Sequence, residues 1–423
     1  MISWLSCVNR TWTGCGTEVS GADMSGALSP DTDILFQQEP SGVTYRIPAL
    51  LYIPQPPVFL AFAEKRSSPN DQDAMYLVMR RGVVGPGGVQ WEPAIAVRHA
   101  KLPGHRTMNP CPVYDPTTKT VLLFFICVRT DCSERWQILT GRNAARLCYI
   151  ASRDQGMSWG RLEDVTEEVL GRDLKNCATL AVGPGHGVCS PSGWLTVPAY
   201  LYYVHSRICG LPIPWKTKAH SFIFYSDDHG ESWHRGSGLW RQETGECQVA
   251  PVSCTNGPDL LYCSARSSRH YRVEATSSPH SIEFSDVHYN RSLCEPPHGC
   301  QGSVVSYQPM AAHQEEDEEG DARDGAEVSC LKHTASSWLL YSHPTSSQKR
   351  IDLGIYLNKS PLVPSNWAPP WVINHGPSGY SDLAVCQDNH SFACLYECGK
   401  DACEKIAFRR FTVEELLDNS SKS

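Results

Sequence analysis

The sequence, 423 residues long, predicts an all-β protein of the propeller type. From Ile34 onward, short apolar segments alternate with turns rich in Gly, Pro, Asp and Ser, which is typical of sandwiches, barrels and propellers. Only residues 164–170 and 412–417 stand out as helical candidates. An octapeptide that occurs twice favours the propeller, because propellers are built from repeated sheets.

A strand with a charged residue in its middle is expected at residues 44–52, Thr-Tyr-Arg-Ile-Pro-Ala-Leu-Leu-Tyr. β-Branched and aromatic residues favour extended backbone, and the Pro-rich segment 54–57 ends the strand. Arg46 has two interpretations. It is either a solvated residue of an edge strand or a ligand for an anion, because a guanidinium can donate two parallel hydrogen bonds to a carboxylate.

The other strands are expected where a short apolar run lies between turns. These runs are residues 58–63, 75–79, 121–128, 147–151, 195–199, 221–225, 260–264, 303–307, 338–341 and 353–357. Residues 1–33 predict a mobile extension, residues 34–417 a single folded domain, and residues 418–423 a tail. The acidic run 315–321 predicts a solvated loop insertion at about residues 310–335.

Two octapeptides, residues 152–159 and 226–233, share the pattern S-x-D-x-G-x-S-W, and each follows an expected strand. In this pattern the Asp carboxylate accepts hydrogen bonds from nearby amides, the Gly supplies a positive φ, and the Trp ring packs beside the turn. We therefore expect two hairpin turns with a structural role. An eroded copy without the Asp and the Gly lies at residues 277–284. The separation of 74 residues between the complete copies predicts more than one sheet unit between them.

The composition excludes several classes of protein. The net charge of −8 argues against a nucleic-acid-binding protein, which needs a basic surface. No apolar run is long enough to span a membrane, and the N-terminus lacks the apolar core of a secretory signal. The 19 cysteines form no regular framework, and several lie in apolar runs, so we expect a reducing compartment. Cys394, Cys398 and Cys403 lack the paired spacing of a zinc site, and we expect neither a metal nor a cofactor.

The Tyr-Arg-Ile-Pro strand followed by the two octapeptides resembles the sialidase (neuraminidase) family, in which such octapeptides are called Asp boxes. The resemblance extends over residues 34–411 and includes six further segments. They are AFAEKR at 61–66, GHRTMNPCP at 104–112, GRNAARLC at 141–148, VGPGHG at 182–187, CEPPHGCQGSVV at 294–305 and YSHPT at 341–345. The last two segments look most like the plasma-membrane-associated, ganglioside-cleaving members. The resemblance implies a six-bladed β-propeller.

The family holds the carboxylate of a sialic acid with three arginines. By motif, the resemblance places them at Arg46, at Arg266 in Ser-Ala-Arg, and at Arg350 in Lys-Arg-Ile-Asp-Leu-Gly. Three guanidiniums in one site repel one another unless an anion or an acidic neighbour offsets their charge. Glu64, in Ala-Glu-Lys-Arg, is expected to be the acidic neighbour that orients Arg46. Taken singly, each arginine has a surface salt bridge as its simpler interpretation.

The resemblance also implies three catalytic residues. Tyr380, in Gly-Pro-Ser-Gly-Tyr-Ser-Asp, matches the nucleophile, since a neutral phenol is not repelled by the substrate carboxylate as a second carboxylate would be. A phenol needs an adjacent base, and Glu246 matches it. Asp71, on a turn-rich segment, matches the general acid and base; Asp73 is its rival, and the spacing from Arg66 favours Asp71.

Further substrate contacts follow from the same matching. Arg66 is expected near the ring hydroxyls on the side opposite the carboxylate. Met108 and Asn109 are expected to line the pocket for the N-acyl group. Glu134 and Gln301 are expected to complete a polar rim.

Tyr200 and Tyr202 are two residues apart and therefore point to one face of a strand. They look like the wall that faces the glycerol side chain of the sugar. The segment that follows, residues 209–215, is Cys-Gly-Leu-Pro-Ile-Pro-Trp and is unusually apolar for a loop. It suits either an amphiphilic substrate or a hydrophobic contact with the barrel, and the sequence leaves both open.

The sequence therefore predicts an exo-α-sialidase that removes terminal sialic acids from glycoconjugates with retention. Gangliosides are the expected preference, with sialoglycoproteins and oligosaccharides as further substrates. A sialic-acid-binding propeller, a trans-sialidase and a scaffold propeller are the alternatives. A pure lectin does not need Asp71, Tyr380 and Glu246 together, whereas transfer differs from hydrolysis only in an acceptor site. Peripheral association with the plasma membrane is expected, with the cytoplasm and endosomal or lysosomal membranes as alternatives.

Overall fold

The computed structural model describes residues 32–236, 242–255, 258–278, 281–309, 335–388 and 390–420. Nearly all of the predicted N-terminal extension and of the acidic insertion lies outside the described residues. Strand β1 already begins at Thr32, and helix α3 runs to Ser420, so the predicted domain bounds of 34 and 417 are too narrow.

Three sheets follow one another along the first half of the chain. The first contains β2 (Thr44–Ile53), β3 (Val58–Arg66), β4 (Ala74–Gly85), β5 (Gly88–Trp91) and β6 (Ile95–Ala96). The second contains β7 (His105–Asp115), β8 (Thr120–Arg129), β9 (Ala145–Ser152) and β10 (Glu163–Asp164). The third contains β11 (Cys177–Val182), β12 (Val188–Cys189), β13 (Leu195–Val204), β16 (Thr217–Ser226) and β17 (His234–Arg235).

The second half of the chain forms two further sheets, of four and seven strands, and completes the fold. A four-stranded sheet contains β18 (Cys247–Val252), β19 (Leu260–Ala265), β20 (Tyr271–Ser277) and β21 (Phe284–Cys294). A seven-stranded sheet contains β22 (Ser303–Tyr307), β23 (Trp338–Pro344), β24 (Ile351–Asn358), β25 (Trp371–Val385), β26 (Ser391–Cys398), β27 (Lys405–Thr412) and β1 (Thr32–Gln37). A small hairpin pairs β14 (Arg207–Ile208) with β15 (Leu211–Pro212).

In the described part of the chain helices are few and short, as the two helical candidates of the sequence predict. They are α1 (Glu134–Thr140), α2 (Thr166–Leu170), α3 (Val413–Ser420) and the 3-10 turns Asp71–Asp73, Gly171–Asn176 and Pro214–Lys216. The two predicted helices correspond to α2 and α3, whereas α1 was not predicted. None of the helices among the described residues is long and apolar enough to cross a bilayer.

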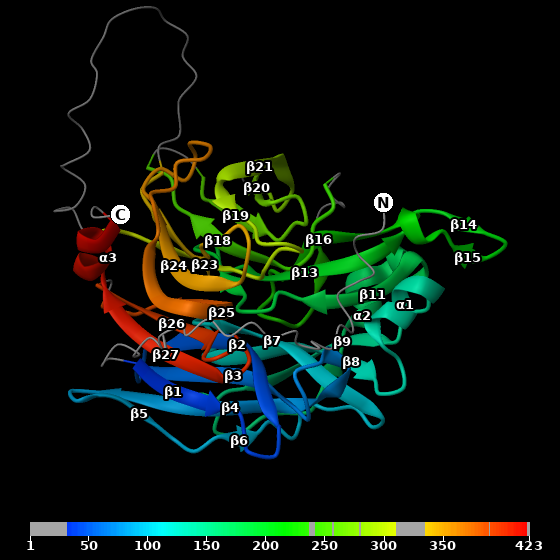
Figure 1. Cartoon of the computed structure of the whole chain (residues 1–423), viewed down its shortest axis with the longest axis horizontal. Helices are drawn as coiled ribbons and strands as arrows, with labels where there is room; N and C mark the ends of the chain where they lie inside the picture. Colours follow the sequence, from blue (N-terminus) through cyan, green and yellow to red (C-terminus); the bar gives the residue numbers. More distant parts are fainter. Residues whose placement is uncertain are drawn as a thin grey trace, which may run out of the picture.

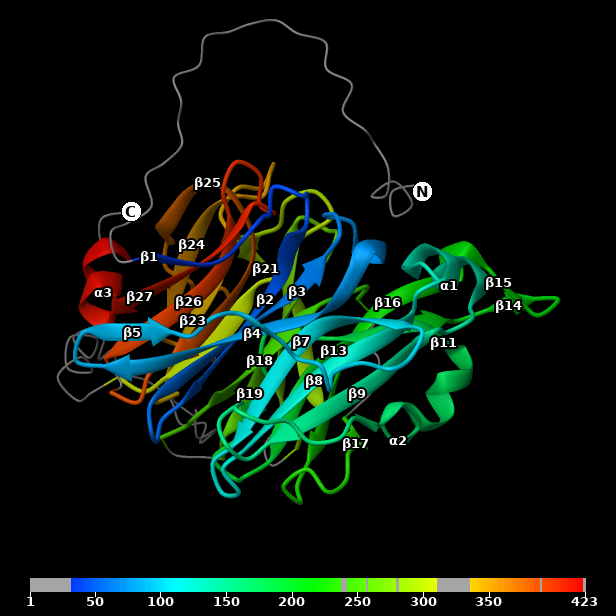
Figure 2. The same cartoon turned by 90° about the horizontal axis from the view of Figure 1, so that it is seen from below.

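The sheets are arranged in the manner of a propeller around a ring of inner strands. β2 contacts β7, β7 contacts β11, β18 contacts β13 and β22, β22 contacts β25, and β25 contacts β2, which closes the ring. Figure 1 shows β2, β7, β13 and β25 in the middle of the molecule, with α3 at one end and the β14–β15 hairpin at the other. Figure 2 shows the same two ends from below. All the predicted strand segments lie within strands of this arrangement.

The two octapeptides form the predicted turns, each between the third and fourth strands of its sheet. Asp154 accepts hydrogen bonds from the amide (2.8 Å) and the hydroxyl (2.5 Å) of Ser158, and Asp228 accepts the same pair from Ser232 (2.9 and 2.6 Å). Trp233 is buried in the core beside the turn. The two turns lie in adjacent sheets, so the prediction of more than one sheet between them is wrong. The excess length is taken up by α2 and the β14–β15 hairpin.

Candidate active site

Tyr380 and Glu246 lie against each other at the inner ends of two different sheets. Tyr380 is in β25, and Glu246 directly precedes β18. The Tyr380 hydroxyl donates a hydrogen bond of 2.6 Å to Oε1 of Glu246. Burial, and then the negative charge of Glu246, raise the pKa of Tyr380 well above its usual value, although Arg266 and Arg350 oppose the shift. The phenol is therefore protonated and already directed at a proton acceptor.

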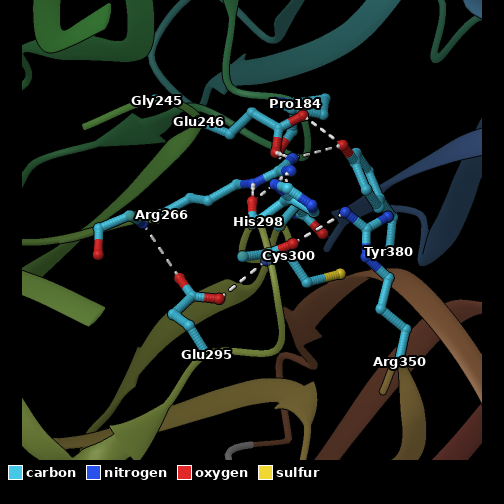
Figure 3. Close-up of polar contacts among 12 residues, drawn as sticks. Pro184, Gly245, Glu246, Arg266, Glu295, His298, Cys300, Arg350 and Tyr380 are labelled. Atoms are coloured by element: carbon cyan, nitrogen blue, oxygen red, sulfur yellow. Dashed lines mark hydrogen bonds and ion pairs between the residues drawn. The ribbon is translucent and has the colours of Figure 1, made fainter. Parts of the chain in front are cut away.

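Arg266 bridges the two members of this pair. Its Nη1 donates to Oε2 of Glu246 at 2.7 Å and to the Tyr380 hydroxyl oxygen at 3.1 Å. Its Nε and Nη2 donate to the carbonyl oxygen of His298 at 3.0 and 2.8 Å. Figure 3 shows the guanidinium held between Glu246 on one side and His298 on the other. A developing phenolate on Tyr380 would thus meet a positive charge at hydrogen-bond distance.

Arg46 and Arg350 flank the ring of the same tyrosine. Their guanidinium carbons lie 5.5 and 5.7 Å from the centre of the Tyr380 ring. Nη2 of Arg350 donates to the carbonyl oxygen of Gly299 at 2.8 Å. The structure therefore brings the three predicted arginines together around Tyr380, and the simpler interpretation of each as a surface salt bridge does not hold.

Irregular pairing positions these residues on the inner strands. The register of β2 shifts directly after Arg46, that of β7 shifts after Met108, and that of β25 shifts around Tyr380. A bulge redirects a side chain that a regular ladder would point along the pleat, and bulges occur preferentially next to active sites. The shift in β2 also leaves the amide of Ile47 free to donate to Glu397 at 2.9 Å.

Glu397, which was not predicted as a site residue, orients Arg46. It is fully buried in β26, and its two oxygens accept hydrogen bonds from Nε and Nη2 of Arg46 at 3.1 and 3.2 Å. It also accepts the amide hydrogen of Tyr380 at 3.0 Å. The prediction that Glu64 orients Arg46 is wrong, because Glu64 pairs with Arg66 instead. The sequence signal for Glu397 is that it is a carboxylate within an otherwise apolar strand. Such a group is rarely buried without a partner, so it indicates an ion pair.

Arg66 joins Glu64 to Asp71. Its Nη2 lies 2.6 Å from the buried Glu64, and its Nη1 donates to Oδ1 of Asp71 at 2.7 Å. The Asp71 side chain is 68% exposed. Partial burial opposes the shift, but the charges of Arg66 and Arg46 hold the pKa of Asp71 below its usual value. Asp73 instead accepts from Ser68 within its own turn, so the geometry favours Asp71 over its rival.

Glu134 is the first residue of α1, and the charges of Asp71 and Glu246 act on its carboxyl group. Loss of solvation, followed by the negative charges of Asp71 and Glu246, raises the pKa of Glu134 to about 7. Tyr200 and Tyr202 lie on the same face of β13, with ring centres 6.4 Å apart. Burial raises the pKa of both, and the next cause is the charge of Glu134. All three thus lie near Glu246, and Tyr200 also lies near Tyr380.

Two of the predicted contacts have mainly structural partners. Gln301 is buried, and its side-chain NH₂ donates to the carbonyl oxygens of Pro184 and Ser381, while its side-chain oxygen accepts from the Ser381 N–H. The prediction that Gln301 forms part of a polar rim is therefore wrong. Asn109 is buried beside Met108, and its backbone N–H donates to Oε1 of Glu64 at 2.7 Å. Met108 and Asn109 therefore lie next to the Glu64–Arg66 pair.

A buried cluster of charges supports the segment 295–300, which supplies the carbonyl groups that hold two of the arginines. Oε1 of Glu295 lies 2.9 Å from Nη1 of Arg272, and Oε2 lies 3.1 Å from Nε2 of His343. The amide of Cys300 donates to Glu295 at 2.8 Å, and its carbonyl accepts from Arg272 at 2.7 Å. Figure 3 shows Glu295 and Cys300 below Arg266. No role was expected for these residues from the sequence.

Comparisons with known proteins first define the class, which is that of BNR repeat-like proteins with the fold of a sialidase. Residues 59–392 match the family model described as "BNR repeat-like domain". The Hadza microbial sialidase Hz136 has the same fold, with a TM-score of 0.69 at 21% identity over 91% of this chain and 69% of that chain.

The family follows from closer relatives. The chain is 50% identical to human Sialidase-3 in an alignment 398 positions long that covers 91% of this chain and 93% of the relative. It is 39% identical to human Sialidase-4 in an alignment 459 positions long, gaps included, that covers 92% of this chain and 95% of the relative. The chain therefore belongs to the sialidase family, as its motifs predicted, and its class of activity is that of a glycoside hydrolase.

Proposed function

We propose that the chain is an exo-α-sialidase that hydrolyses terminal sialic acids with retention, using Tyr380 as the nucleophile. The observation that carries this proposal is the convergence of three guanidiniums on one phenol that donates to a carboxylate. Glu246 and Glu397 offset the charges of Arg266 and Arg46, but Arg350, which donates to the carbonyl of Gly299, adds a third positive charge that repels the other two. A substrate carboxylate seated between Arg46, Arg266 and Arg350 offsets that repulsion.

In the first step, the glycosidic bond between the anomeric carbon and the leaving oxygen breaks. Asp71 gives its proton to that oxygen, while the Tyr380 oxygen bonds to the anomeric carbon and its proton passes to Glu246. Arg66 and Arg46 keep Asp71 ionised in the free protein. Binding of the substrate carboxylate neutralises part of this positive charge, which favours the protonated form of Asp71.

In the second step, a water molecule attacks the anomeric carbon on the opposite side from Tyr380. Asp71 now takes the proton of that water, and Tyr380 leaves with the proton that returns from Glu246. Two displacements at one carbon restore its configuration, so the product retains the α-anomer. Asp71 is then protonated and Glu246 ionised, as at the start of the first step.

The remaining residues are proposed to bind the sugar. Arg66 is directed toward the ring hydroxyls, Asn109 and Met108 toward the N-acyl group, and Tyr200 and Tyr202 toward the glycerol side chain. Glu134, next to these tyrosines, is proposed to accept hydrogen bonds from that side chain in its ionised form and to donate one when protonated.

Kinetics on a soluble fluorogenic sialoside test the catalytic roles. Tyr380→Phe retains the three arginines and Glu246 but has no nucleophile, so kcat is expected to fall by about 10³-fold or more with little change in KM. Asp71→Ala is expected to lower kcat by about 10²–10⁴-fold. Wild-type turnover is expected to be fastest on the acid side of neutrality. Wild-type activity in Tyr380→Phe, or a rate that rises steadily toward alkaline pH, would contradict the mechanism.

We further propose gangliosides as the preferred substrates, with sialoglycoproteins and oligosaccharides as weaker ones, and peripheral association with the plasma membrane. We also infer six propeller blades. The support for this count is β25, whose first part pairs with β24 and whose last part pairs with β26, so that the seven-stranded sheet divides into two units. Comparing hydrolysis of a ganglioside with that of a sialylated glycoprotein tests the preference.

A further inference from the structure

Three large apolar side chains project from the β14–β15 hairpin and the 3-10 turn that follows it. Ile208, Leu211 and Trp215 are 64%, 66% and 68% exposed. Ile208 and Leu211 are directly opposite each other in the hairpin, so they lie on the same face of it. The sequence left open whether this segment packs against the barrel, and for these three side chains the structure excludes that packing.

Helix α1 extends the same apolar surface. Trp136 and Leu139 are three residues apart, lie on one side of the helix and are both exposed. Nη2 of Arg207 in the hairpin donates to the carbonyl of Gly141, directly after α1, at 3.3 Å. Figures 1 and 2 show α1 and the hairpin together at one end of the molecule. The apolar tip is defined here as Trp136, Leu139, Ile208, Leu211 and Trp215.

The surroundings of the apolar tip are basic in a chain whose net charge is −8. Residues 135–143 and 203–220 contain no Asp or Glu. They contain five cationic residues, Arg135, Arg142, Arg207, Lys216 and Lys218. Glu243 lies 3.4 Å from Lys218 and offsets that charge, and Glu134 adds one negative charge at the start of α1, so the other cations still leave an excess of positive charge around the tip. Exposed tryptophans and aliphatic side chains beside cations favour the interface of a bilayer that contains anionic lipids.

The apolar tip lies next to the proposed active site along two segments of chain. Strand β13 carries Tyr200 and Tyr202 and continues into the hairpin, so Ile208 is at most about 20 Å from Tyr202 along the backbone. Helix α1 begins with Glu134, two residues before Trp136. A membrane in contact with the tip is therefore close enough to present the sugars of its own glycolipids to the site.

We propose that the apolar tip is the surface through which this protein binds a lipid bilayer containing anionic lipids, with the active site held over sialylated glycolipids of that bilayer. The benefit to catalysis rests on the proposed function. The binding itself does not, because apolar insertion and charge attraction require no turnover.

Flotation of the full chain with phosphatidylcholine vesicles, with and without phosphatidylserine, tests the surface. The test variant combines Ile208→Ser, Leu211→Ser and Trp215→Ser. The matched control combines Ile95→Ser, Met157→Ser and Val363→Ser, which are also exposed apolar residues but lie outside the tip. The tip variant is expected to partition into vesicles about tenfold less than the wild type, whereas the control binds normally. Arg142→Glu with Lys216→Glu is expected to weaken binding only where phosphatidylserine is present.

Activity distinguishes the surface from the site. The tip variant is expected to keep kcat/KM within about twofold on a soluble sialoside, and to lose about tenfold on a sialylated glycolipid in vesicles. Equal flotation of wild type and tip variant, or equal loss in the control variant, would overturn the proposal. A wild-type dimer that the tip substitutions dissociate, without any vesicle binding, would assign the tip to a second copy and also overturn it. Normal vesicle binding by a wild type that hydrolyses no sialoside supports the surface and refutes the proposed function instead.

Discussion

Replacing Glu397 by glutamine is expected to raise KM for a sialoside more than it lowers kcat. The carboxylate accepts four hydrogen bonds, two from Arg46 (3.1 and 3.2 Å), one from the amide of Ile47 (2.9 Å) and one from that of Tyr380 (3.0 Å). Glutamine has the same shape but only one acceptor oxygen. Its NH₂ group therefore faces two of these donors, whichever way the side chain is turned.

The magnitude follows from the burial of this carboxylate, which is complete. An unsatisfied buried donor costs about 1–3 kcal/mol, and breaking a buried ion pair by removing one charge costs about 3–5 kcal/mol. We expect Glu397→Gln to lower the free energy of unfolding by about 3 kcal/mol. A positioned group displaced by about 1 Å costs on the order of 10² in rate, so kcat/KM is expected to fall about 100-fold as Arg46 loses its orientation.

Steady-state kinetics on a soluble sialoside and thermal unfolding together provide the assay. Glu274→Gln is the matched control, because Glu274 is also buried but bonds to Tyr262, Trp367 and Asn290 away from the site. It is expected to lower Tm without changing KM. If Glu397→Gln likewise lowers Tm and leaves KM within twofold of the wild type, the carboxylate supports only the fold and the reasoning is refuted.

Three further predictions concern the surroundings of the site. Because the pKa of Glu134 is raised to about 7, the wild type gains a negative charge beside the substrate between about pH 6 and pH 8. Its KM for a sialoside is therefore expected to rise over that interval, and to rise less in Glu134→Gln. Parallel KM profiles of the two proteins would contradict this. The charges of Arg272 and His343 lower the pKa of Glu295 to about 2, although burial opposes this shift. The stability that this carboxylate contributes is therefore complete above about pH 4.5 and is lost as the pH falls through about 2. Glu295→Gln is expected to lower Tm and kcat/KM at pH 5–7, and a Tm difference from the wild type that is absent there would refute the role of the cluster. Trp233→Ala is expected to lower the free energy of unfolding by about 3–5 kcal/mol. Because the turn lies away from the site, kcat/KM at low temperature is expected to stay within about twofold of the wild type. A preserved Tm would show that the ring packs weakly.

The strands and the turns could be predicted from local sequence because their causes are local. Residues 44–52 form β2 because extended backbone suits their side chains, and the octapeptides form turns because each Asp bonds to a Ser four residues later. Helix α1 was missed because it is short and offers little periodicity. Its signals were Ser133, whose hydroxyl accepts from Trp136, and Gly141 with φ of 61°.

The partners of the site residues could not be predicted, because they are distant in sequence. Glu397 is 351 positions from Arg46, and only the closure of the ring of inner strands brings them together. Glu64 is close to Arg46 across β2 and β3 but pairs with Arg66, which the motif could not show. Residue types at motif positions thus predicted which groups meet, whereas register and bulges decide how each group is held.

The central claim is that Tyr380 bonds covalently to the sugar. Incubation with a 3-fluorosialyl fluoride, whose electron-withdrawing fluorine slows the second step, followed by peptide mass spectrometry, tests this directly. One sialyl adduct is expected on the peptide that contains Tyr380, abolished by Tyr380→Phe and formed slowly in Glu246→Gln. An adduct on Asp71 or on another carboxylate, or rapid inhibition without any adduct, would contradict it.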